Sequence, residues 1–316
     1  MRRLPGQFNS IEIVLFGMPC RFTAQALTAL VNAGHTVKTV ILPRHIDHDV
    51  QVMMPQASKP RIPMVEANRQ LTVLPNVAAL TWSAGAALVE TSRGQLASLP
   101  RRFVSLRQGV VISACFPWKL PQEVLEAPPL GCLNIHPSLL PRHRGPDPLF
   151  WTFRGGDRQT GVTVHRMTAG LDDGPVLLQQ RIDLPLKIRY DKADHQAIML
   201  GAKLIVQAID GLAAGVLDPH DQVEINASYE SHPKVSDREI DLSWPAERAF
   251  RFVRGIETAY GLVHINLPDA DPATVIDAET LQPGRSLGRP YHHSGNRVSV
   301  QFADGVVTFL TPETGS

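Results

Sequence analysis

GCLNIHPSLLPRHRG, residues 131–145, joins a short apolar run to a loop bounded by prolines. If Cys132–His136 form a β-strand, the two-residue period of the strand places Asn134 and His136 on one face. An amide and an imidazole then project side by side where the strand ends. Open α/β sheets bind their ligands at that edge. The stretch therefore predicts a functional site at the end of a sheet strand.

The residues before this stretch predict an α/β fold. Ile11–Phe16 is a nearly continuous apolar run of strand length, and Gly109–Ala114 is another, as expected for strands buried on both faces. Residues 22–31 carry apolar side chains at helical spacing, and 37–42 predict a further strand. This is a βαβ order. Because Gly17–Cys20 lacks the glycines of a GxGxxG motif, a nicotinamide or other dinucleotide cofactor is disfavoured.

The last third of the chain predicts a smaller β-rich region. Residues 196–214 have the apolar spacing of a helix, and the polar segment after them has no clear period. The chain then ends in a predicted hairpin whose Asp304-Gly305 turn joins 298–302 to 306–309. The predicted division is a catalytic domain at 1–222, a linker at 223–235 and a small C-terminal β-rich domain at 236–316.

Composition is that of a soluble globular protein. Of 316 residues, 43% are hydrophobic and 19% are charged, and 31 Lys and Arg balance 30 Asp and Glu. No whole-molecule field is expected to attract nucleic acid, although a local patch stays open. No signal-peptide pattern stands at the amino terminus, and no run approaches about 18 apolar residues. We therefore expect a cytoplasmic protein without a membrane partner.

The cysteines and histidines do not predict a metal site. Cys20, Cys115 and Cys132 are odd in number, far apart and without a CxxC pair, which favours reduced thiols over disulfides or zinc ligation. His45 and His48 are near neighbours in a loop, but no third close ligand completes a set.

Three motifs resemble one enzyme family. They are the run 134–145, then Thr160–Thr163, then Gly170–Gly174, and together they resemble the 10-formyltetrahydrofolate-dependent formyltransferases. The methionyl-tRNA formyltransferases are the most similar group, followed by the sugar N-formyltransferases. The similarity is strong over residues 110–180 and weaker over 11–42 and 236–256. It implies a Rossmann-like formyltransferase domain with a mostly parallel sheet, followed by a small open barrel, and a formyl-folate co-substrate without metal.

The resemblance also assigns site residues. Its catalytic set is Asn134, His136 and Asp172, with Asp172 chosen over Asp173. Without the resemblance, His136 is equally typical of a buried core histidine, and the Asp-Gly turn of a solvated loop. As a set they suit formyl transfer, because the amide and imidazole can donate to an oxyanion and the carboxylate can relay protons. The implied folate-contacting residues are Trp118, Lys119, Leu120, Ser138, Leu139, Leu140, Pro141, Thr168, Ala169, Gly170 and Leu171.

Several activities fit these residues. The resemblance implies formyl transfer from 10-formyltetrahydrofolate to a primary amine, with initiator methionyl-tRNA as the acceptor. A small amine such as an amino-sugar nucleotide is the alternative acceptor. Hydrolysis of formylfolate is a second possible reaction, and a non-catalytic folate-binding or RNA-binding module is a third possibility. The presence of all three catalytic residue types argues against the non-catalytic possibility.

Features that tRNA-formylating relatives use are weak in this chain. The loop 43–63 has three basic residues against two acids, and 256–260 stands where those relatives usually have a proline-tryptophan feature. A strip of arginines near the central motif is a candidate phosphate contact, or a set of solvated positions. These arginines are Arg142, Arg144, Arg154, Arg158 and Arg166.

Overall fold

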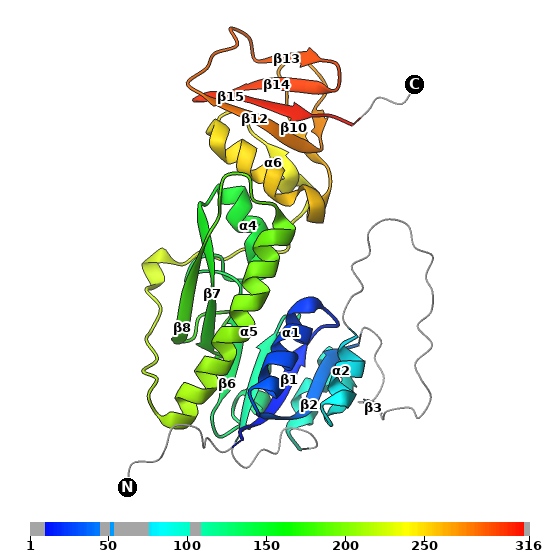
Figure 1. Ribbon diagram of the computed structural model, residues 1–316, viewed down its shortest axis with the longest axis vertical. Helices are drawn as coiled ribbons and strands as arrows, with labels where there is room; N and C mark the ends of the chain where they lie inside the picture. Colours follow the sequence, from blue (N-terminus) through cyan, green and yellow to red (C-terminus); the bar gives the residue numbers. More distant parts are fainter. Residues whose placement is uncertain (1–9, 45–50, 54–75, 102–108, 313–316) are drawn as a thin grey trace. The chain divides into compact units, whose positions relative to one another are not determined.

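The computed structural model describes residues 10–44, 51–53, 76–101 and 109–312 (Figure 1). Two compact units are formed. The first contains residues 1–141, 162–180 and 198–227, and the second contains 142–161, 181–197 and 228–316.

One large sheet dominates the part of the chain that the structure describes. Its strand order is β3-β4-β2-β1-β5-β6-β7-β8. The pairs β1–β2, β2–β4, β1–β5 and β5–β6 are parallel, whereas β3–β4 and β6–β7 are antiparallel. The predicted α/β fold with a mostly parallel sheet is thus confirmed. The strands are β1 (Glu12–Gly17), β2 (Thr36–Pro43), β3 (Gln51–Met53), β4 (Ala87–Thr91), β5 (Gly109–Ala114), β6 (Cys132–His136), β7 (Gln159–Arg166) and β8 (Val176–Asp183).

The central strands are apolar because helices and 3-10 turns cover them. All six residues of β5 are buried, as expected for a parallel strand with both faces covered. Helix α1 contacts β2 and β5, and it ends just before Gly34, whose φ of 84° favours glycine. The other helical segments of this region are α2 (Val77–Ser83), η1 (Arg93–Arg101) and α3 (Gln122–Leu125), with α1 at Arg21–Asn32.

Helix α5 (Tyr190–Ala214) begins six residues before the predicted helix at 196–214. Of the described helices, it alone is long and apolar enough to cross a membrane by length and composition. It contains Lys192, Asp194, Lys203 and Asp210, so it is not a continuous apolar run. Half of its apolar window is buried inside the protein. A Cβ on its Gly201 would lie 3.0 Å from both Ile135 and Phe22. Such close packing is typical of a core helix.

The second unit has an aromatic core. Phe150 and Phe153 of α4 (Pro148–Gly155) share that core with Phe250 and Phe252 of α6 (Ala246–Tyr260). Two small sheets complete the unit, in the orders β11-β10-β9 and β12-β15-β14-β13. Their strands are β9 (Glu239–Ile240), β10 (Val263–Ile265), β11 (Ala273–Val275), β12 (Asp277–Pro283), β13 (Tyr291–Ser294), β14 (Arg297–Phe302) and β15 (Gly305–Leu310).

The predicted hairpin is present, with its turn one residue earlier than expected. Phe302 pairs with Gly305, so that Ala303-Asp304 form the two-residue loop. Gly305 therefore begins β15 and does not close the turn. The antiparallel register holds from Arg297 opposite Leu310 to the loop.

The compact units do not follow the predicted division at 222 and 236. The boundary between Ala227 and Ser228 falls inside the predicted linker 223–235, which also contains η2 (Glu224–Asn226) and meets η3 (Val235–Arg238). Segments 142–161 and 181–197, predicted as catalytic domain, belong to the second unit. The physical reason is the aromatic core, which buries α4 together with α6. The functional division itself stays a prediction.

Candidate active site

Three side chains meet at the carboxyl end of β6. Asn134 Nδ2 donates to Asp172 Oδ1 at 3.1 Å. His136 Nδ1 lies 3.7 Å from Asp172 Oδ2, and the two side chains are only 6% and 10% exposed. The structure thus brings together all three residues of the predicted catalytic set, in a largely dry environment where electrostatic interactions are strong.

The turn between β7 and β8 aims Asp172 at the histidine. Asp172 has a φ of 53°, and its carbonyl accepts a 2.8 Å hydrogen bond from Gln222, which also binds the carbonyl of Gly174. A Cβ at Gly174 would collide with the carbonyl oxygen of Arg166, so only glycine fits there. Asp173 instead accepts a hydrogen bond from Thr168. Asp172, and not Asp173, therefore faces His136.

A second histidine belongs to the cluster, and the sequence analysis did not identify it. His165 stands opposite Asn134 in the β6–β7 register. Its Nε2 lies 3.2 Å from Asn134 Nδ2 and 3.6 Å from Asp172 Oδ1, and its side chain is 2% exposed. In 160–166, Val162 and Val164 alternate with Thr163 and His165, a pattern that places the two polar residues on one strand face. Only the register with β6 shows which residue His165 faces.

Thr163 holds the loop that follows His136. Its hydroxyl donates to the carbonyl of Ser138 at 2.7 Å and lies 3.3 Å from the amide of Leu140. Gln179 donates to the Leu140 carbonyl at 2.9 Å, and the Leu140–Pro141 peptide is cis. Ser138 and Leu140 are buried, whereas Leu139 and Pro141 are half-buried. Of the predicted folate contacts in this loop, Leu139 and Pro141 are the side chains open to a ligand.

The other predicted folate-contacting residues differ in accessibility. Trp118 is half-buried and meets Phe116 edge-on at 5.4 Å, and Phe116 meets Phe16 at 5.1 Å. These three rings, here called the aromatic chain, run from the buried Phe16 to the partly accessible Trp118. Lys119 is exposed, whereas Leu120 is 4% exposed and lies in the core. In the turn after β7, Thr168 and Ala169 are exposed, and Gly170 and Leu171 are half-buried.

The five arginines of the predicted cationic strip already have protein partners. Each guanidinium contacts a carboxylate, an aromatic ring or a backbone carbonyl. A phosphate would therefore have to compete with these existing contacts. The contacts are Arg142 to Asp157 at 3.1 Å, Arg158 to Glu247 at 2.7 Å, Arg144 over the Tyr229 ring at 4.9 Å, Arg154 over the Trp244 ring at 5.2 Å, and Arg166 to the Leu130 carbonyl at 3.1 Å.

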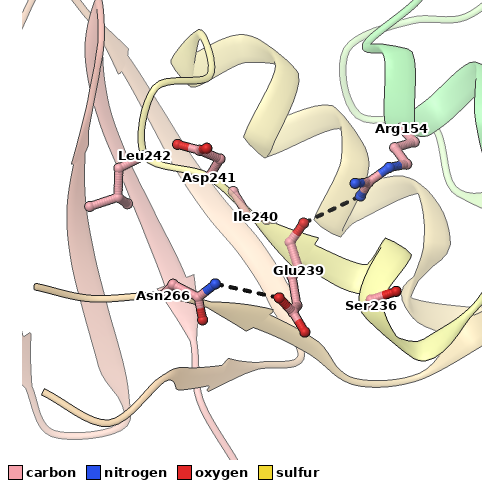
Figure 2. A pocket seen from close by; sticks show the side chains of 7 residues that line it. All are labelled: Arg154, Ser236, Glu239, Ile240, Asp241, Leu242 and Asn266. Carbon is pink, nitrogen blue, oxygen red and sulfur yellow. Dashed lines mark hydrogen bonds between the residues drawn. The ribbon is translucent and has the colours of Figure 1, made fainter.

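A separate polar pocket lies in the second unit (Figure 2). Its volume is about 380 Å³. Glu239 stands at its centre, where its carbonyl accepts from Arg154 at 3.3 Å and its carboxylate from Asn266 at 3.5 Å. No motif in the sequence predicts this pocket. Its lining residues are Arg154, Ser236, Glu239, Ile240, Asp241, Leu242 and Asn266.

Across 10–44, 51–53, 76–101 and 109–312, no group of three or more His, Cys, Asp or Glu side chains is placed to hold an ion. His45 and His48, with Lys59 and Arg61 of the same loop, lie outside those residues.

Two thiols, Cys20 and Cys115, follow the ends of β1 and β5. Thr23 Oγ1 is 3.5 Å from Cys20 Sγ and donates to the Ala114 carbonyl at 2.8 Å. A hydrogen bond with Cys115 lowers the pKa of Cys20 to about 6. Burial raises the pKa of Cys132 to about 12. None of the three cysteines forms a disulfide.

Cys20 is therefore expected to react as a thiolate at neutral pH. Its alkylation rate by iodoacetamide, followed by peptide mass spectrometry from about pH 5 to about pH 9, should rise with a midpoint near pH 6. Cys132 should stay unmodified in the folded protein. Cys115→Ala removes the hydrogen bond and should move the Cys20 midpoint upward. A Cys20 midpoint near the ordinary value of about 8.5 in the parent would contradict this assignment.

Comparison with known proteins confirms the resemblance. Residues 12–209 match the formyl transferase family. The methionyl-tRNA formyltransferase of Chloroflexus aggregans is 32% identical over 287 residues, covering 89% of this chain and 86% of that protein. The methionyl-tRNA formyltransferase of Bordetella pertussis is 30% identical over 314 residues, covering 95% of this chain and 93% of that protein.

A solved structure has the same fold. The N-formyltransferase from Helicobacter canadensis, in complex with folinic acid and dTDP-3-aminofucose, aligns with a TM-score of 0.67. It is 14% identical, and the alignment covers 96% of this chain and 99% of that one. The match over residues 12–209 and the identity to the two relatives show that this chain belongs to the formyl transferase family.

Proposed function

We propose that this formyl-group transferase moves the formyl group of 10-formyltetrahydrofolate to a primary amine. The observation that carries the proposal is the cluster at the end of β6, where Asp172 lies 3.1 Å from Asn134 and 3.7 Å from His136. Family membership supplies the reaction class. In the cluster, Asp172 supplies a proton acceptor, His136 an N–H donor and Asn134 an amide held in place. These are groups that the reaction needs.

In the proposed reaction, the nitrogen of a neutral amine attacks the formyl carbon and forms a tetrahedral oxyanion. An N–H of His136 stabilises the negative oxygen, and the nearby Asp172 carboxylate orients the imidazole. The amine loses one proton, for which Asp172 is the acceptor, directly or through a water. Collapse of the intermediate breaks the bond to N10, which gains one proton from His136. The products are the formamide and tetrahydrofolate.

The folate is proposed to lie between the aromatic chain and the two loops. Half-buried Trp118 offers a flat wall for a pterin, and flat apolar walls suit such ligands. Leu139 and Pro141 are accessible on the loop after β6, and Leu171 on the turn before β8. Buried Ser138, Leu140 and Leu120 are assigned a supporting part, since their side chains are covered.

His136→Ala tests the chemistry. Loss of an oxyanion donor costs on the order of a hundredfold in kcat, and the variant should lose at least that in formyl transfer. Its melting temperature should still rise with 5-formyltetrahydrofolate, because donor binding is left intact. His292→Ala, at an exposed histidine of β13, is the matched control and should keep parental activity. Turnover of His136→Ala within a few fold of the parent would remove His136 from the mechanism.

For the acceptor, the proposal follows the sequence relatives. Proteins 30–32% identical over most of this chain are methionyl-tRNA formyltransferases, which supports initiator methionyl-tRNA, with residues 236–316 helping to hold it. One observation favours a second candidate. Arginines of the predicted strip are already paired, as Arg142 is with Asp157 and Arg158 with Glu247. A protein of the same fold was solved with an amino-sugar nucleotide. That candidate is a small amine of this kind.

The acceptor is tested by supplying 10-formyltetrahydrofolate with either charged initiator tRNA or a pool of amino-sugar nucleotides. With tRNA, apparent affinity should fall steeply between about 50 and 200 mM salt, because phosphate contacts release counterions. A nucleotide sugar has only two phosphates and should lose far less. Formylation of the sugar amine alone, with tRNA inert even at low salt, would refute the tRNA proposal and leave formyl transfer intact.

A cytoplasmic location is proposed on separate grounds. The three cysteines form no disulfide with one another, which suits a reducing compartment. The folate donor and either acceptor are soluble, so the proposed reaction calls for no membrane partner.

A further inference from the structure

His165 lies inside the site but has no part in the reaction proposed above. It sits in β7 directly opposite Asn134, and its side chain is 2% exposed. The His136 ring stands edge-on to it with 6.5 Å between centroids. Three groups are close to its ring nitrogens: the Arg166 carbonyl, the Asn134 amide and the Asp172 carboxylate.

The contacts of the ring determine its protonation. His165 Nδ1 is 2.8 Å from the carbonyl oxygen of Arg166. A carbonyl can only accept, so Nδ1 carries a hydrogen. Nε2 is 3.2 Å from Asn134 Nδ2, which can only donate. Nε2 must then offer a lone pair. Both hydrogen bonds are satisfied only by a neutral imidazole with its hydrogen on Nδ1.

The same reasoning fixes the Asn134 amide. One of its two N–H groups points to His165, and the other donates to Asp172 Oδ1 at 3.1 Å. The reversed amide would place its oxygen against the carboxylate oxygen and against the Nε2 lone pair, which are both acceptors. Both N–H groups of Asn134 are therefore engaged. Asn134 therefore does not donate to the oxyanion, which is the role expected from the sequence. What its amide can offer to a substrate is an acceptor, the oxygen Oδ1.

We propose that His165 is a positioning residue, which holds the Asn134 amide so that Oδ1 accepts an N–H of the attacking amine. This inference rests on the proposed formyl transfer. An amine that donates one N–H to Oδ1 has its direction fixed before its lone pair reaches the formyl carbon, which lowers the entropic part of the activation barrier. The oxyanion is left to His136. Because its side chain is only 2% exposed, His165 is assigned an action through Asn134 and not on a substrate.

Two variants separate positioning from simple filling of space. His165→Gln keeps an acceptor oxygen at a distance from the backbone similar to that of Nε2. His165→Leu fills comparable volume and offers no acceptor. We expect His165→Leu to lose about tenfold in kcat, the loss expected for one hydrogen bond, with KM for the donor within a few fold of the parent. His165→Gln should recover most of that kcat.

A double-mutant cycle supplies the decisive kinetic readout. Because His165 acts through Asn134, His165→Leu should cost little kcat when Asn134→Ala is already present. Equal losses in the two backgrounds, or a His165→Gln variant no better than His165→Leu, would overturn the proposal. Melting temperatures are recorded for all variants, and if His165→Leu does not fold, His165→Ala, which also lacks a side-chain acceptor, takes its place in the cycle.

A measurement on the parent protein does not depend on catalysis. Long-range ¹H–¹⁵N correlation spectra of the histidine rings, with the His165 signals assigned by their loss in His165→Gln, report which nitrogen carries the hydrogen. Nδ1–H with an unprotonated Nε2 at neutral pH is the expected result. Nε2–H or a doubly protonated ring would overturn the inference, whereas a failure of formyl transfer alone would leave this readout standing and count against the proposed function.

Discussion

The antiparallel pairing of β6 with β7 is the constraint on which the site depends. It sets His165 opposite Asn134 and Thr163 opposite His136. From there Thr163 ties down the loop after His136, and His165 ties down the amide. Gln222 donates to the Asp172 carbonyl in the turn after β7. This turn places the Asp172 carboxylate beside Asn134 and His136. A shift of one residue in this register would turn each of these side chains to the other face of the sheet. The site therefore forms only in the observed register.

Local pattern was enough to predict much of the fold and part of the site. The apolar runs of β1 and β5 and the helical spacing of α1 are short-range signals, and the structure places those elements within a residue or two of the prediction. The two-residue period of β6 put Asn134 and His136 on one face. Asp172 came from the family resemblance, since an Asp-Gly turn has no chemistry by itself. His165 could not be found, because strand register is a long-range property.

The charges show a similar limit. A sequence records arginines but not their partners, and Arg142, Arg144 and Arg158 turn out to be committed to Asp157, Tyr229 and Glu247. Likewise, α4 was predicted with the catalytic domain by its place in the chain, yet its aromatic face is buried against α6. Both differences have one physical origin: the burial of a side chain is decided by neighbours distant in sequence.

The central claim is that formyl transfer takes place at Asn134, His136 and Asp172. A crystal structure of the protein with 5-formyltetrahydrofolate tests it most directly. The predicted result is a pterin against Trp118 and the loop of Leu139 and Pro141, with the formyl group within about 4 Å of His136 and Asp172, the range over which such groups can act on it. Folate bound away from this cluster, for example in the polar pocket around Glu239, would contradict the claim.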